Sequence, residues 1–112
     1  YKSFSGIEAH SLTLPVVPNS ILSNYHMFYL LIDSLEQRDS FISYMKSKNI
    51  LVVFHYIPLH SSNFAHQHLN RYHLPTTVEN AQKLVRLPIF FSLTEGEQKR
   101  VIDEVQFFFT NN

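Results

Sequence analysis

The residues with the richest side-chain chemistry stand together near the middle of the chain, in the stretch VFHYIPLH at positions 53–60. Branched and aromatic residues that are typical of a buried strand lead directly into His55 and Tyr56, and His60 follows shortly after. Imidazole and phenol groups donate and accept hydrogen bonds, so they can bind a polar ligand or move a proton. The pattern indicates a strand that ends in a binding rim.

Pro58 decides how this rim can be presented. Neighbouring side chains of a regular strand point to opposite faces, so His55 and Tyr56 cannot share a face while the strand continues. Proline ends the backbone hydrogen bonding, and the chain then leaves the strand before His60. We expect His55, Tyr56 and His60 to surround one mouth as substrate-binding residues. A histidine or tyrosine at the end of a core strand is also often a hydrogen-bonded packing residue, and this alternative stays open.

Other candidate residues carry weaker signals. Arg86 in the stretch VRLP can bind a carboxylate or phosphate through two hydrogen bonds, although an arginine beside a core strand more often forms a surface ion pair. His66, His68 and His73 include an H-x-H pair, but no further ligand follows at a convincing spacing, so we expect no metal. None of the serines lies on a recognisable nucleophile elbow.

Composition excludes several classes of function. The chain has 112 residues, of which 45% are hydrophobic, enough for one domain with one core. Nine basic and nine acidic side chains cancel, so we expect neither a nucleic-acid nor a membrane partner. Cysteine is absent, which removes disulfides and thiolate chemistry and fits the cytoplasm. The two glycines, Gly6 and Gly96, are too few and too distant for a glycine-rich phosphate loop.

The elements that position the rim follow from the apolar pattern. Residues 1–24, with Pro15 and Pro18, read as an extended connecting segment, and residues 25–112 read as one α+β domain. Strands are expected in the stretches HMFYLLI (26–32) and ILVVFHYI (50–57), of which the second has the clearer pattern. A short extended piece, RLPIFF, contains Pro88 in its middle.

Three helices are expected around these strands. The first covers residues 36–48, with Ser34 and Gln37 as a capping box and Asn49 as its end. The second begins at Thr76 or Thr77 after a long loop with about one helical turn. The apolar face of this second helix is expected to hold Val78, Ala81, Leu84 and Val85. The third starts at a Thr94–Glu97 capping box and repeats apolar residues with helical spacing, namely Val101, Ile102, Val105, Phe108 and Phe109.

These elements predict a small α+β fold, a sheet of three to four strands with helices packed on one face. The two predicted strands are apolar at nearly every position, as in strands that are covered on both faces. The helices can cover one face, so we expect the other to be covered by a further domain of the same polypeptide. The chain also begins with Tyr1, and its first methionine is Met27. We therefore expect it to be part of a longer polypeptide, with self-association where bare apolar surface is exposed.

The chain resembles the C-terminal domain of DegT/StrS-type sugar-nucleotide aminotransferases. The likeness runs from about Leu12 to Phe109 and rests on HMFY, HYIPLHSS and RLPIF followed by LT..EQ, in this order. The resemblance implies the small C-terminal domain of the aspartate-aminotransferase fold in a cytoplasmic homodimer that uses pyridoxal phosphate. Such an enzyme moves an amino group from glutamate, giving 2-oxoglutarate, to a nucleotide-linked 4-keto-6-deoxy sugar for surface polysaccharide.

The resemblance also assigns residues. The family's His-Tyr pair falls on His55 and Tyr56 and its loop histidine on His60, as contacts to the sugar substrate. Pro58, Arg86 and Pro88 are expected to shape the cleft. Asn49 stands where relatives commonly carry glycine, a change that its tolerance of left-handed backbone makes harmless.

The family's Schiff-base lysine has no match in this chain. The five lysines, Lys2, Lys46, Lys48, Lys83 and Lys99, lie outside the context that the family uses for it. We therefore expect the isolated chain to be catalytically inactive and not to carry the cofactor. The alternative interpretation is a free-standing α+β ligand-binding or regulatory module without catalysis.

Overall fold

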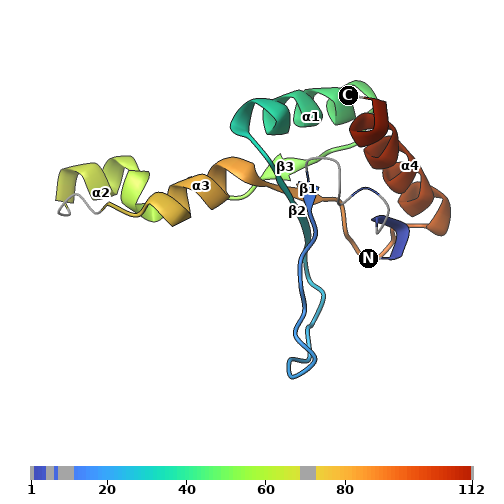
Figure 1. Cartoon of the computed structure of the whole chain (residues 1–112), viewed down its shortest axis with the longest axis horizontal. Helices are drawn as coiled ribbons and strands as arrows, with labels where there is room; N and C mark the ends of the chain where they lie inside the picture. Colours follow the sequence, from blue (N-terminus) through green and yellow to red (C-terminus); the bar gives the residue numbers. More distant parts are fainter. Residues whose placement is uncertain (1, 5–6, 8–11, 69–72, 112) are drawn as a thin grey trace.

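A computed structural model of the chain describes residues 2–4, 7, 12–68 and 73–111 (Figure 1). Within these residues, the strands form one sheet, and helices lie around it. In chain order, the elements are η1 (Lys2–Phe4), β1 (Leu12–Thr13), β2 (Phe28–Ile32), α1 (Leu35–Ser47), β3 (Val53–Phe54), η2 (Leu59–Ser61), α2 (Asn63–His68), α3 (Pro75–Lys83), β4 (Leu84–Leu87) and α4 (Glu95–Asn111).

The sheet has four antiparallel strands in the order β1-β2-β4-β3. The predicted strand at residues 26–32 is confirmed as β2, which pairs with β4 so that Leu30 lies opposite Val85. This register places Leu30, Ile32, Val85 and Leu87 on one face, and all four are buried. The predicted α+β class with a small sheet is confirmed.

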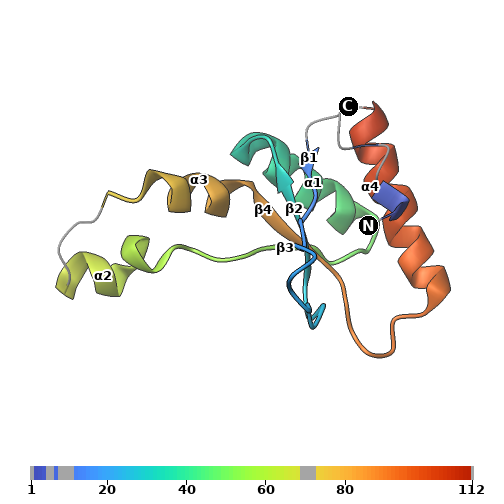
Figure 2. The same ribbon diagram turned by 60° about the horizontal axis from the view of Figure 1, so that its bottom comes forward.

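Helices α1 and α4 supply the other half of the core. Helix α1 lies against β2 and β4, and α4 packs on α1 (Figure 2). The ring of Phe41 on α1 contacts those of Phe108 and Phe109 on α4, with centroids 5.2 and 5.3 Å apart. The helical spacing in the sequence therefore predicted the buried face of α4 correctly, except that Ile102 is only partly buried.

The predicted helix ends are confirmed at three places. The hydroxyl of Ser34 accepts a hydrogen bond from the backbone N–H of Gln37 at 3.1 Å. Thr94 and Glu97 form the full capping box, since each side chain accepts a hydrogen bond from the other residue's backbone N–H. Asn49 takes a left-handed conformation with φ of 56° and ends α1.

The second predicted helix is wrong at both ends. Leu74 is the residue that precedes α3, and Pro75 occupies its first position, where the absent N–H of proline costs nothing. Thr76 and Thr77 therefore lie inside the helix. At the other end, Leu84 and Val85 belong to β4 because they pair with β2. The helical spacing of apolar residues continues from α3 into β4. The boundary between the two elements is set by the pairing of β4 with β2, which is distant in sequence.

The strand predicted over residues 50–57 is also corrected. Among the described residues, only Val53 and Phe54 pair with β4, and β3 is an outer strand of the sheet. Both side chains are exposed. Ile50 and Val52 are buried ahead of it. The predicted long loop after His60 contains more helix than expected, in η2 and α2, and four of its residues (69–72) lie outside the described ones.

The N-terminal part of the chain contributes residues to the core and then forms an arm that extends beyond the sheet. Phe4, Ile7, Leu12 and Leu14 are buried, and β1 pairs with β2. Residues 14–27 then run out beyond the sheet and back as an arm (Figure 1). Helices α2 and α3 extend away from the sheet in both views (Figures 1 and 2). The radius of gyration is consequently 15.7 Å, above the roughly 13 Å expected for a compact domain of this length.

Candidate functional site

The candidate site begins where β3 ends. The antiparallel pairing of β3 with β4 places Val53 opposite Arg86, so the residue that follows β3 can meet the Arg86 side chain. The Arg86 guanidinium donates a hydrogen bond from Nη1 to Nδ1 of His55 at 2.9 Å. The structure thus brings together two residues that the sequence had assigned separately, one to substrate binding and one to cleft shape.

Burial and charge both act on His55. Its pKa is lowered, first by burial of the imidazole, then by the positive charge of Arg86 and by the nearby His26. Each of these effects disfavours a second positive charge at the strand end. His55 is therefore neutral at neutral pH.

Tyr56 lies beside His55 but is far more open, with 68% of its surface exposed. The two rings approach to 3.4 Å between centroids. Together with Pro58 and residues of α3, they line a surface hollow of about 690 Å³, within the size range of small-molecule sites. The hydroxyl-bearing residues Thr76 and Thr77 lie on the α3 side of this hollow.

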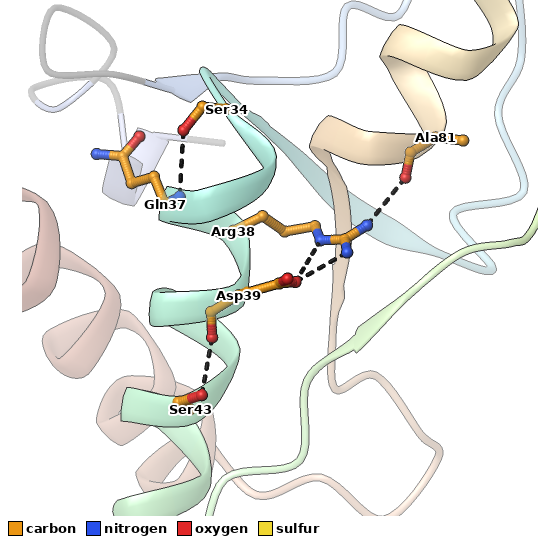
Figure 3. Close-up of polar contacts among 6 residues, drawn as sticks. All are labelled: Ser34, Gln37, Arg38, Asp39, Ser43 and Ala81. Carbon is orange, nitrogen blue, oxygen red and sulfur yellow. Dashed lines mark hydrogen bonds and ion pairs between the residues drawn. The ribbon is translucent and has the colours of Figure 1, made fainter.

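Helix α3 is held at the hollow by an arginine that the sequence interpretation missed. Arg38 on α1 is buried, and its guanidinium donates to the backbone carbonyl of Ala81 at 3.1 Å and to the Asp39 carboxylate at 2.8 Å (Figure 3). The same group lies 5.3 Å from the centre of the Phe54 ring. A signal existed in the sequence, since Arg38 shares its helical spacing with Phe41 and Met45, which predicts that it faces the core.

The structure places His60 on a different hollow from His55 and Tyr56, and its role as a substrate contact stays a prediction. Helix η2 turns the chain immediately after Pro58, and His60 lines a separate hollow together with His73 and Glu79. Pro88 is also remote. Because β3 and β4 are antiparallel, the end of β3 adjoins the start of β4, whereas Pro88 follows the end of β4 and lines a hollow with Phe28.

The described residues do not fit pyridoxal phosphate by themselves. The cofactor needs a lysine amine for its Schiff base, an acidic group at the pyridine nitrogen and phosphate donors. The lysine side chains that the structure describes point elsewhere: Lys48, Lys83 and Lys99 form ion pairs with Glu104, Glu79 and Asp103, and Lys46 lines a hollow with Asn49. No described lysine lines the hollow of His55 and Tyr56.

The described part of the chain contains neither a candidate metal site nor a candidate membrane-spanning helix. No three histidine, aspartate or glutamate side chains there are grouped closely enough to hold a metal ion. The same residues contain no helix of the length and apolarity that crossing a membrane requires.

Comparison with known proteins matches this chain to aminotransferases, both by a family model and by solved structures. Residues 3–106 match the model of the DegT/DnrJ/EryC1/StrS aminotransferase family. Among solved structures, the chain is similar to DesV of S. venezuelae, with 26% identity and a TM-score of 0.81 over 96% of this chain and 29% of that one.

Two further solved structures have the same fold at lower identity. The aminotransferase TlmJ of Streptoalloteichus hindustanus is 20% identical with a TM-score of 0.81, over 98% of this chain and 31% of that one. The aminotransferase PseC of Helicobacter pylori, involved in the biosynthesis of pseudoaminic acid, is 16% identical with a TM-score of 0.81, over 99% and 31%. The chain spans less than one third of the length of each of these proteins.

Proposed function

The chain belongs to the DegT/DnrJ/EryC1/StrS aminotransferase family, and we propose that it is the small C-terminal domain of a pyridoxal-phosphate-dependent sugar aminotransferase. The observation that carries this proposal is the match over nearly the whole of this chain to less than a third of its structural neighbours. A further structural neighbour, the sugar aminotransferase Spr1654 of Streptococcus pneumoniae, is described as a PLP form, which supports the choice of cofactor. The remaining two thirds of such a protein would hold the cofactor and the catalytic lysine.

Exposed apolar residues support a missing neighbour. The arm carries Val16 and Leu22, which are 84% and 99% exposed, and Leu59 is 87% exposed beside the hollow. Apolar side chains of this size and exposure are the ones that a contact with further protein would bury. A larger domain of the same polypeptide, or the second subunit of a homodimer, would cover them.

The substrate is proposed to be a nucleotide-linked 4-keto-6-deoxy sugar, with glutamate as amino donor. The finer proposal is the transaminase that makes TDP-4-amino-4,6-dideoxygalactose for surface polysaccharide in the cytoplasm. It rests on the order of the motifs around His55, Tyr56 and Arg86. In this proposal, the hollow beside β3 receives the sugar, and the rim residues contact its hydroxyl or carbonyl oxygens.

The test uses the natural polypeptide that contains this chain. We expect His55→Gln and Tyr56→Phe to weaken binding of the TDP-linked keto sugar by tenfold or more, a loss of about 1.4 kcal/mol, while cofactor occupancy stays constant. Spectral titration of the bound cofactor measures both quantities. His66→Gln, on the exposed surface of α2, is the matched control. Unchanged sugar affinity in both rim variants, or a stop codon just before Tyr1 in the gene, would contradict the proposal.

A further inference from the structure

The hydrogen bond between Arg86 and His55 fixes the chemistry of the imidazole. A guanidinium carries only donors and stays protonated in proteins, so it cannot accept a hydrogen bond. The atom that it meets, Nδ1 of His55, must therefore offer its lone pair. Because a neutral imidazole carries one proton, that proton lies on Nε2.

The surroundings of His55 support the neutral form. The charged or titratable groups that act on it are Arg86 on β4, His26 ahead of β2 and the adjoining Tyr56. None of them is a carboxylate that could stabilise an imidazolium. Protonation would also break the bond to Arg86 and place two positive groups in contact.

The placement of Arg86 suits a supporting role. The residue belongs to a central strand, where it is paired with Tyr29 of β2 on one side and Val53 of β3 on the other. Its Nε is buried and has no hydrogen-bond partner among the described residues. Among the described residues, the guanidinium makes its side-chain hydrogen bond to His55, and His55, not Arg86, lines the hollow.

We propose that Arg86 is a positioning residue that holds His55 as the neutral Nε2–H tautomer, so that the hollow beside Tyr56 presents a hydrogen-bond donor to an oxygen acceptor of the ligand. The ligand group opposite Nε2 is then a hydroxyl, carbonyl or phosphoryl oxygen and not an ammonium or amide N–H. In this state His55 cannot act as a general base, because Nε2 already carries a proton and Nδ1 is occupied. The identity of the ligand as a sugar nucleotide rests on the proposed function, whereas the tautomer does not.

The experiment is ¹⁵N NMR of histidine side chains in the natural polypeptide, with His55 assigned by the signal that His55→Gln removes. In the wild type we expect a fully unprotonated Nδ1, a protonated Nε2 and a pKa below the ordinary histidine value. Arg86→Met removes the donor, so Nδ1–H becomes populated and the pKa of His55 rises. Arg86→Lys keeps a positive group that carries donors only, so the unprotonated Nδ1 and the lowered pKa of His55 are both retained.

The outcomes separate the two proposals. A protonated Nδ1 or an imidazolium in the wild type at neutral pH overturns the role of Arg86, and this reading needs no Arg86 variant to fold. A titration of His55 that is the same in Arg86→Met as in the wild type also overturns it. Adding TDP-linked 4-keto-6-deoxyglucose should shift the Nε2 signal while Nδ1 stays unprotonated. If that compound does not bind, the proposed substrate fails, while the unliganded spectra still decide the role of Arg86.

Discussion

Arg38 on α1 donates a hydrogen bond to the backbone carbonyl of Ala81 on α3, 43 residues further along the chain (Figure 3). Ala81 lies in the last turn of α3, just before β4, and lines the hollow of His55 and Tyr56. Since the same guanidinium lies over the Phe54 ring, one side chain joins α1, α3 and β3. The wall of the candidate site is therefore set by a residue outside the site.

Replacing Arg38 with methionine should destabilise the chain by about 2 kcal/mol, because a hydrogen bond from a charged donor is lost and the Ala81 carbonyl loses its partner. Urea unfolding followed by circular dichroism measures the change. Asp39→Asn is the control, since Asp39 is mostly exposed and an exposed ion pair contributes less than about 1 kcal/mol. Equal effects of the two substitutions would show that Arg38 acts only through Asp39.

Tyr44 and Glu104 should make stability depend on pH in the acid range. The Tyr44 hydroxyl donates to the Glu104 carboxylate at 2.5 Å, and this bond, with Lys48, lowers the pKa of Glu104 below 4.5. A carboxyl with a lowered pKa stabilises the fold above its unfolded pKa, and the contribution is lost as pH falls through the folded pKa. We expect Tyr44→Phe to cost about 1.5 kcal/mol at pH 7 and progressively less below pH 4.5.

The measurement for this pair is urea unfolding of both proteins at a series of pH values. Glu79→Gln is the control, because Glu79 also has a lowered pKa but pairs with Lys83 on an exposed surface. A gap between wild type and Tyr44→Phe that stays constant down to pH 3 would show that the bond does not depend on an ionised Glu104.

Replacement of Thr94, which precedes α4, and of Thr76, in the first turn of α3, should differ in its effect on stability. Thr94→Ala removes the capping box of α4 and should cost about 1 kcal/mol. Thr76→Ala should change stability by less than about 0.5 kcal/mol, because Thr76 lies inside α3 and its hydroxyl caps nothing. Thermal unfolding of the two variants compares them directly, and a larger loss at Thr76 would restore the helix start that the sequence suggested.

Asn49 offers a test of backbone conformation alone. Its φ of 56° is costly for residues with an ordinary Cβ, so Asn49→Ala should cost about 1 kcal/mol. Asn49→Gly should be neutral or slightly stabilising, since glycine adopts this region without strain. Chemical unfolding of both variants provides the comparison, and a loss at glycine as large as at alanine would indicate a side-chain role for Asn49.

Elements with local signals were predictable from the sequence. The strand β2 and the helices α1 and α4 are each marked by a capping residue, a boundary or a regular apolar spacing within a few residues. The junction of α3 and β4 was not, because Leu84 and Val85 continue the helical spacing and only their pairing with β2 makes them a strand. Strands that pair across such a distance in sequence carry no local sequence signal of that pairing.

The candidate site was predictable to the same extent. His55 and Tyr56 were found because a strand and a proline bracket them, and the structure places both on one hollow. The contact of Arg86 with His55 depends on the register between β3 and β4, 31 residues apart, and the sequence alone does not set it. The position of His60 on a separate hollow was not predictable, because no sequence signal marks the turn of η2 directly after Pro58.

The lengths of the strands bear on how the chain behaves beside copies of itself. The central strands β2 and β4 have five and four residues, while the outer strands β1 and β3 have two each. An outer strand exposes unpaired backbone groups that can template the addition of a foreign strand, and this risk grows with its length. Because each outer strand of the described sheet has two residues, it provides a poor template for amyloid-like strand addition. Association of this chain should therefore proceed through its exposed apolar side chains and not through its backbone.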